Sequence, residues 1–162
     1  MAAGLSLPEE NLTLFREAIN RACSLSEQDM IPKIKIDIAM PVGYPNAELI
    51  RELEILEPFG KSNTKPLFAD KDLKIKRMSV IGRNQNVLRL TLETGYAKTV
   101  TAVYFGDIQK FLDYYGQKYG QEQVEAALKG KNNKILLQIV YYPEINMYNG
   151  IESIQMIIRN YR

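Results

Sequence analysis

Histidine and tryptophan are absent from the 162 residues of this chain, and cysteine occurs once. Without histidine there is no imidazole general base, no Ser-His or Cys-His nucleophile pair, and little basis for a transition-metal site. The lone Cys23 excludes an internal disulfide and is typical of a protein from a reducing compartment. No apolar run approaches the ~20 residues of a membrane span, and no secretory signal opens the chain. We therefore expect a cytoplasmic protein with no membrane partner.

Two further kinds of chemical motif are missing from the sequence. It contains neither a glycine-rich phosphate loop nor paired cysteines with metal-ligand spacing. Its acidic residues are scattered over positions expected on helix surfaces, which is a poor arrangement for a carboxylate-only magnesium site. We therefore expect that this chain is not itself an enzyme and holds no metal or other cofactor.

The charges that are present divide unevenly at about residue 60. Residues 1–60 carry 5 Lys and Arg against 10 Asp and Glu, a net charge of −5, whereas residues 61–162 carry 16 against 9, a net charge of +7. Nine of the ten tyrosines also lie in the second part. Cations match phosphates and aromatic rings match bases, so this composition favours a single-stranded nucleic acid as the ligand.

Residues 1–60 are predicted to form two helices and one strand. A capping-box pattern at Ser6–Glu9 predicts a helix that runs to about Cys23, with Leu12, Phe15 and Ile19 on one face. Strict alternation over Lys33–Ile38 predicts a strand whose three isoleucines face a core, and Ala47–Glu57 is predicted to be helical. So few elements cannot close a core of their own. We therefore interpret residues 1–60 as an incomplete piece of a preceding domain.

Residues 61–162 are predicted to form a five-stranded barrel, which makes the chain an α+β protein. A helical block is expected at 107–129, with a break near 116–120. The expected strands are 73–81, 87–94, 98–105, 134–142 and 150–159. Five strands with two tight hairpins fit either an SH3-like barrel or an OB-fold, and a helix after the third strand favours the OB-fold.

Several motifs resemble the RecJ family of single-strand-specific exonucleases. Pro58-Phe59-Gly60, followed by Asn63, Pro66 and Phe68, is similar to the linker that leads into the family's OB domain. At the end of the third strand, Tyr104-Phe105-Gly106 is also similar to the family. In the last hairpin, the similar motif is Asn146-x-Tyr148-x-Gly150-x-x-Ser153-Ile154-Gln155-Met156. Ala2-Ala3-Gly4-Leu5-Ser6 and residues 32–37 resemble the end of the DHHA1 domain, which precedes the OB domain.

The resemblance implies both an architecture and a function. Residues 1–60 would be the end of a DHHA1-like domain with its connecting helix, and residues 61–162 an OB domain. The function implied is to hold single-stranded DNA for a 5′-to-3′ exonuclease that acts in DNA repair and recombination. The Asp-His-His centre of such an exonuclease, which would hold manganese or magnesium, is absent from this chain. The implied partners are single-stranded DNA, the catalytic DHH and DHHA1 domains, and a single-strand-binding protein.

Candidate contacts follow from the alternation of side chains along the strands. If Leu88, Leu90 and Leu92 point inward, Arg89 points outward. Tyr104, Phe105, Phe111 and Tyr141 are expected in the core. The residues predicted to contact phosphates or bases are Lys76, Arg77, Arg83, Arg89, Tyr96, Lys98, Tyr148 and Arg159.

Two other functions fit the same sequence. The tyrosine-rich block at 107–129 suits a module that docks a replication or repair protein, because tyrosine is favoured at interfaces. The second alternative function is that of a purely structural cap on a catalytic core. Binding through phosphates would weaken steeply with salt, whereas docking through an apolar surface would not.

Overall fold

The computed structural model describes residues 4–94 and 98–162, and the chain divides into two compact units, Met1–Ile34 and Lys35–Arg162. The first unit contains η1 (Glu9–Asn11), α1 (Leu12–Ala22) and η2 (Glu27–Met30). The predicted helix is confirmed, but the predicted cap at Ser6 is wrong: Pro8 precedes the helical segment, and no side chain caps it. A reciprocal capping box forms instead at η2, where Asp29 Oδ2 accepts from the amide and hydroxyl of Ser26 at 2.8 and 2.6 Å.

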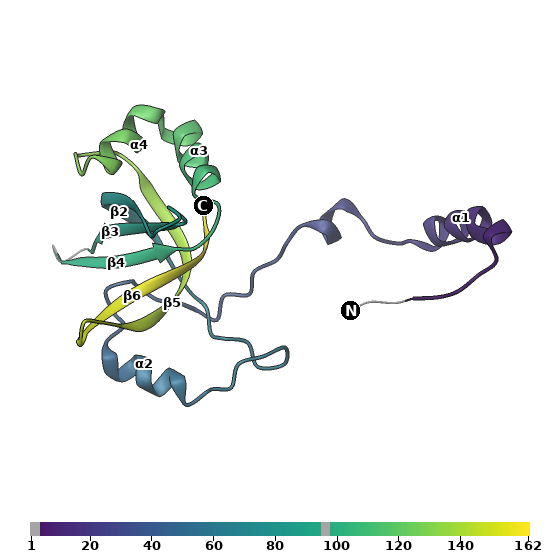
Figure 1. The fold of residues 1–162 in the computed structure, drawn as a ribbon, viewed down its shortest axis with the longest axis horizontal. Coiled ribbons are helices and arrows are strands. Elements are labelled where there is room, and N and C mark those ends of the chain that lie inside the picture. The colour runs from purple at the N-terminus through teal and green to yellow at the C-terminus, as the bar shows by residue number, and fades with distance from the viewer. Residues whose placement is uncertain (1–3, 95–97) are drawn as a thin grey trace. The chain divides into compact units, whose positions relative to one another are not determined.

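Five strands of the second unit close into a ring, which Figure 1 shows between the labelled helices. They are β2 (Phe68–Ile81), β3 (Val87–Glu93), β4 (Thr99–Tyr104), β5 (Leu136–Tyr148) and β6 (Ile151–Tyr161). Their order is β2-β3-β4-β6-β5, and β5 pairs again with β2. The β4–β6 pair is parallel, and the other pairs of the ring are antiparallel. All five predicted strands are confirmed, in the order of an OB-fold.

Side-chain alternation along the strands fills the ring with apolar residues. Leu88, Leu90 and Leu92 are fully buried, so the predicted inward face of β3 is confirmed. Tyr141 and Phe111 are buried as expected, and Tyr104 packs partly buried against the core. The expectation for Phe105 is wrong, because β4 ends at Tyr104 and the next side chain is 61% exposed.

Helices cover the two ends of the ring. Figure 1 shows α3 (Ile108–Tyr119) and α4 (Gln121–Leu128) at one end and α2 (Ala47–Glu54) at the other. Phe111 and Val124 contribute to the core from one end, while Leu53 packs partly buried against it from the other. The predicted helical block is confirmed, and its break lies at Gly120, where φ is +95°. None of the helices in the described residues is long and apolar enough to cross a membrane.

A sixth, short strand leads into the ring. β1 (Ile38–Ala39) pairs in parallel with the start of β2, and Met40 N donates to Ala69 O at 2.9 Å. The hydroxyl of Tyr141 donates to Met40 O at 2.8 Å. Met40 and Val42 are buried in the same core as the ring strands. The predicted boundary at residue 60 stays a prediction.

The expectation for residues 33–38 is wrong in two respects. The strand begins only at Ile38, and the three isoleucines at 34, 36 and 38 are 42%, 45% and 59% exposed. The exposure of these three side chains means that alternation here does not correspond to a buried face.

Aromatic rings cluster between α3 and the end of β6. Phe111 lies 4.5 Å from Tyr161 and 4.9 Å from Tyr115, measured between ring centroids. The Tyr115 hydroxyl donates to Arg162 O at 2.9 Å. Burial raises the pKa of Tyr115 and of Tyr141 far above the ordinary value, and raises the pKa of Tyr161 to about 12. The tyrosine-rich block therefore directs much of its aromatic surface into its own domain.

Candidate nucleic-acid interface

The outward side chains of β3, β4, β6 and β5 form one continuous surface, named here the outer face. Cross-strand partners lie on the same face of a sheet, so the register identifies its rows. The first row runs Arg89, Val103, Ile157, Tyr142, and the second runs Thr91, Thr101, Gln155, Glu144. Along β5 and β6 the face continues through the pairs Asn146–Ser153 and Tyr148–Ile151. Val103 and Ile157 in the middle of the first row are buried, so the accessible groups of the face are Arg89 and Tyr142 at its sides and the hydroxyl and amide groups of the second row.

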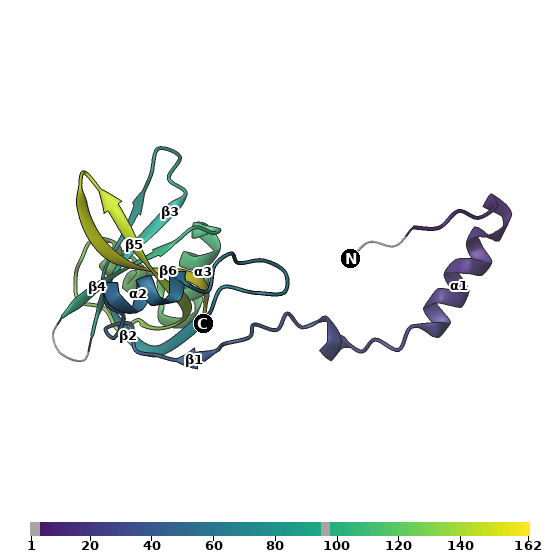
Figure 2. The same cartoon turned by 90° about the horizontal axis from the view of Figure 1, so that it is seen from below.

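Two hairpins border this surface. In Figure 2 the β2–β3 and β5–β6 hairpins project from the same side of the ring. Arg83 lies in the β2–β3 turn and is exposed, and Tyr148 lies at the end of β5 with 70% of its surface exposed. With Arg89 on the face between them, a cation and an open aromatic ring lie at opposite borders.

A second basic group lies at the β5 side of the outer face. The charge of Arg159 lowers the pKa of Tyr142, opposing the larger effects of burial and of Glu144, which raise it. Lys65 Nζ lies 4.0 Å from the centroid of the Tyr142 ring and 5.6 Å from that of Phe59. The Lys65 ammonium therefore lies within cation–π range of the Tyr142 ring.

Lys65 and Tyr142 were missed by the sequence reasoning. For Tyr142 a signal existed, because Leu137, Ile139 and Tyr141 alternate inward and so place their neighbour outward. For Lys65 no such signal existed, because it lies in the linker before β2, where no strand period applies.

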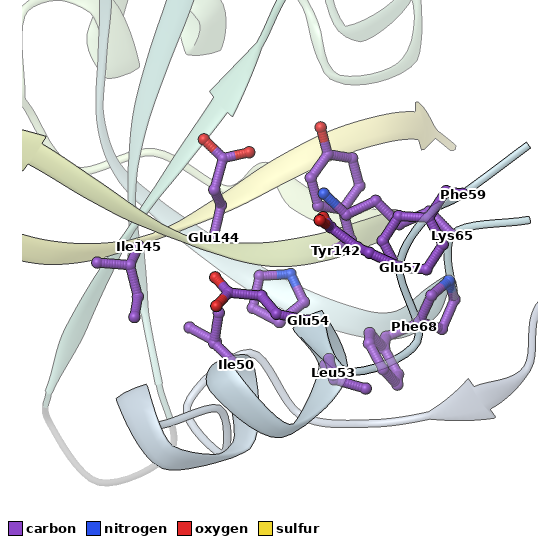
Figure 3. A pocket seen from close by; sticks show the side chains of 12 residues that line it. Ile50, Leu53, Glu54, Glu57, Phe59, Lys65, Phe68, Tyr142, Glu144 and Ile145 are labelled. Carbon is purple, nitrogen blue, oxygen red and sulfur yellow. The ribbon is translucent and has the colours of Figure 1, made fainter.

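A carboxylate-lined cleft marks the limit of the basic surface. This cavity of about 290 Å³ lies between α2, the linker and β5, and its apolar part includes Ile50, Phe68 and Ile145. Figure 3 shows the carboxylates of Glu54, Glu57 and Glu144 around it. Lys65 and Tyr142 line the same cavity, so one cation stands there against three carboxylates. This excess of negative charge disfavours a phosphate backbone inside the cleft.

The remaining predicted contacts lie apart from the outer face or at its border. Lys76 is the extra residue at the β2 bulge, and Arg77 pairs across to Thr91, with its side chain beside Gly130. Lys98 lies on the β3–β4 hairpin beside a cavity that Asp70, Asp72 and Glu93 also line. Tyr96 lies outside the described residues. Arg83 and Tyr148 thus lie at opposite borders of the outer face and Arg89 lies on it, whereas Arg159 lies near the end of β6 that is remote from the hairpin. The roles of the predicted residues in binding stay predictions.

The electrostatic state of these cations suits a polyanion. Within residues 4–94 and 98–162, no salt bridge involves any of the candidate lysines and arginines. The same residues contain no group of three His, Cys, Asp or Glu side chains that could hold a metal ion. Over the part of the chain that the structure describes, the donor set therefore does not fit the manganese or magnesium that the resemblance implies for a catalytic core.

Known proteins of similar sequence and structure point to one family. The chain is 26% identical over 162 residues to the single-stranded-DNA-specific exonuclease RecJ of Bacillus subtilis (strain 168), and spans 99% of itself but 18% of that protein. Crystal structures of RecJ from Thermus thermophilus, in complex with Mg²⁺ and with Mn²⁺, each match 97% of the chain with a TM-score of 0.59 and 16% identity. The chain covers 21% and 20% of those two proteins.

A family model gives the most direct assignment. The model of the RecJ OB domain matches residues 36–160, which include β1, α2, all five ring strands and the two helices α3 and α4. The chain therefore belongs to the RecJ OB domain family.

Proposed function

We propose that this chain binds single-stranded DNA on its outer face and holds the strand for the catalytic core of a RecJ-type exonuclease acting in repair and recombination. The proposal is carried by three arginines of the basic part of the chain, Arg83, Arg89 and Arg159, which have no carboxylate partner among the described residues, together with the open ring of Tyr148. Family membership supports it, because the Bacillus subtilis relative is named for specificity toward single-stranded DNA.

Each group has a defined task in this proposal. The guanidinium groups neutralise phosphates, which releases counterions, and Tyr148 stacks on a base. The threonines and Gln155 of the second row donate to and accept from base edges or sugars. Duplex DNA binds more weakly, because paired bases do not expose their faces.

The chemistry of cleavage belongs elsewhere. The chain spans under a quarter of the RecJ proteins it matches, and its described residues lack a metal-binding group. We infer that a cytoplasmic parent protein supplies the manganese or magnesium centre in its other domains. Labelled single strands incubated with this chain and Mn²⁺ should stay intact, and metal-dependent release of mononucleotides from a clean preparation would refute this inference.

The deciding experiment is a salt titration of binding to a labelled single-stranded oligonucleotide. Replacing Arg83, Arg89 and Arg159 together by Ala should weaken binding to all sequences, and each lost phosphate contact should lower the salt slope by about 0.7. The matched control replaces three exposed lysines of α3 and its neighbours, Lys110, Lys118 and Lys129, which removes the same charge from the helical end.

The control also tests the alternative, a module that docks a replication or repair partner such as a single-strand-binding protein. If the two triple variants lose affinity equally, the effect is one of net charge, and the outer face is not the interface. If neither changes binding, the protein-docking function becomes the better explanation.

A further inference from the structure

The tip of the β5–β6 hairpin exposes three large apolar side chains. Met147, Tyr148 and Ile151 are 60%, 70% and 70% exposed. Tyr148 pairs with Ile151 on the outer face, whereas Met147 pairs with Glu152 on the opposite face of the arm. The outer flank of the tip therefore carries two apolar side chains, and the opposite flank carries Met147 beside the Glu152 carboxylate.

The arm that carries this tip is stiff. Its strands pair without interruption from Tyr141–Ile158 to Tyr148–Ile151. Asn149 and Gly150 form the two-residue turn with φ of +50° and +77°, a conformation that matches the twist of a hairpin. On the side of α2, Arg51 Nη2 lies 3.2 Å from Glu152 Oε2 and braces the arm.

The tip also extends beyond the ring. The β4–β6 pairs run from Thr101–Gln155 to Tyr104–Ile158, and continuing this parallel register places Thr99 beside Ser153, so that only Ile151 and Glu152 precede the start of β4. Residues 144–158 contain no Lys or Arg. The tip thus offers nothing to a phosphate, and its apolar groups match base faces, whereas the arginines of the neighbouring outer face match the backbone.

We propose that this tip is a wedge that inserts where a single strand emerges from a duplex, with a tailed duplex as the preferred ligand. The proposal rests on the single-strand binding proposed above. The Tyr148–Ile151 flank stacks on the base of the strand that continues over the outer face, and the Met147 flank contacts the base of the partner strand. Apolar side chains inserted between base steps unstack them in this way in other DNA-binding proteins.

The test uses the full chain and two probes with the same single-stranded segment, one free and one extending from a duplex. A 2-aminopurine at the junction reports unstacking by its fluorescence. We expect the tailed probe to bind about tenfold tighter than the free probe, because stacking on roughly one additional base supplies about that factor in affinity. The fluorescence of the 2-aminopurine should rise at the same time.

The variant Met147→Ser, on the face of the arm opposite the outer face, should lose this preference and the fluorescence rise while keeping its affinity for the free strand. Ile55→Ser, at a residue 80% exposed next to α2, is the control for removing exposed apolar surface. Both variants change exposed positions, and melting curves verify that they fold.

The outcomes separate the two proposals. Binding of the free strand with no preference for the tailed probe overturns the wedge and leaves single-strand binding standing. Failure to bind the free strand overturns single-strand binding and, with it, the wedge. A preference that persists in Met147→Ser also overturns the wedge. Docking of a protein at the tip, with equal DNA affinities in wild type and variant, overturns it as well.

Discussion

Tyr148 shows how a single side chain can be available to a ligand because of the backbone that carries it. It ends β5 directly before a tight turn, and its ring is 70% exposed beside a surface bordered by arginines. A tyrosine in that position keeps both a hydrophobic ring face and a hydroxyl at the water boundary.

Replacing Tyr148 by Ala should weaken binding to single-stranded DNA by about 1–3 kcal/mol with little change in the salt slope, because stacking releases no counterions. Fluorescence anisotropy at several salt concentrations measures both quantities. Tyr44→Ala is the matched control, since Tyr44 is 69% exposed but lies outside the outer face. Equal losses in the two variants would contradict the assignment.

Buried tyrosine hydroxyls make the fold sensitive to alkaline pH. The pKa values of Tyr115 and Tyr141 are raised in the folded chain, mainly by burial. Below the unfolded pKa of about 10 both states are protonated and the stability is fully present. Above it the unfolded chain loses these protons while the folded chain keeps them, so stability falls by about 1.4 kcal/mol per pH unit for each tyrosine.

Urea unfolding between pH 8 and pH 11 checks this expectation. The contribution of these two tyrosines to the free energy of unfolding should stay constant up to about pH 10 and should then decline. Tyr115→Phe removes one of the two titrating hydroxyl groups, so the free energy of unfolding of this variant should decline less steeply with pH. A decline of the same steepness in wild type and variant would show that other groups are responsible.

At the scale of elements, α2 is held by one deeply buried contact. Ile50 is 3% exposed, whereas Ile55 at the end of the same helix is 80% exposed. Ile50→Ala should cost about 2–5 kcal/mol of unfolding free energy, and Ile55→Ala less than about 0.5 kcal/mol. Chemical denaturation of both variants measures the difference, and a similar small loss in both would mean that α2 packs only loosely.

Elements inside the ring were predictable from the sequence, and those outside it were not. The Leu88, Leu90 and Leu92 alternation gave the correct face of β3 because one side of that strand has a core to fill. Ile34 and Ile36 alternate equally well, yet they are exposed. Alternation reports a strand-like pattern, but the existence of a covering layer depends on tertiary packing.

The same limit applies to the candidate site. Arg89 could be placed outward from its leucine neighbours, whereas Lys65 is brought to Tyr142 by the path of a linker, which no local pattern encodes. Lys76 and Lys98 were predicted from their places in a strand and beside a turn, but a strand period could foresee neither the bulge that Lys76 occupies nor the acidic residues around the cavity beside Lys98.

At the scale of the whole molecule, the extent of the folding unit can be tested with two fragments. Met40, Val42 and Ile50 are buried within the unit that begins at Lys35, although they precede the predicted boundary at residue 60. A fragment of residues 35–162 should therefore melt cooperatively near the temperature of the full chain. A fragment of residues 61–162 loses these side chains and should melt at a much lower temperature, by calorimetry; equal melting of both would support the boundary at residue 60.

The parallel pairing of β1 with β2 also has a mechanical meaning. Asp37 N donates to Leu67 O, Met40 N donates to Ala69 O, and the Asp37 carboxylate accepts from Leu67 N, so several bonds join two strands that run in the same direction. A pull along the axis of β1 loads these bonds together in shear instead of opening them one after another. Tension arriving through the N-terminal segment would therefore be borne at this clamp before it reached the strands that carry the outer face.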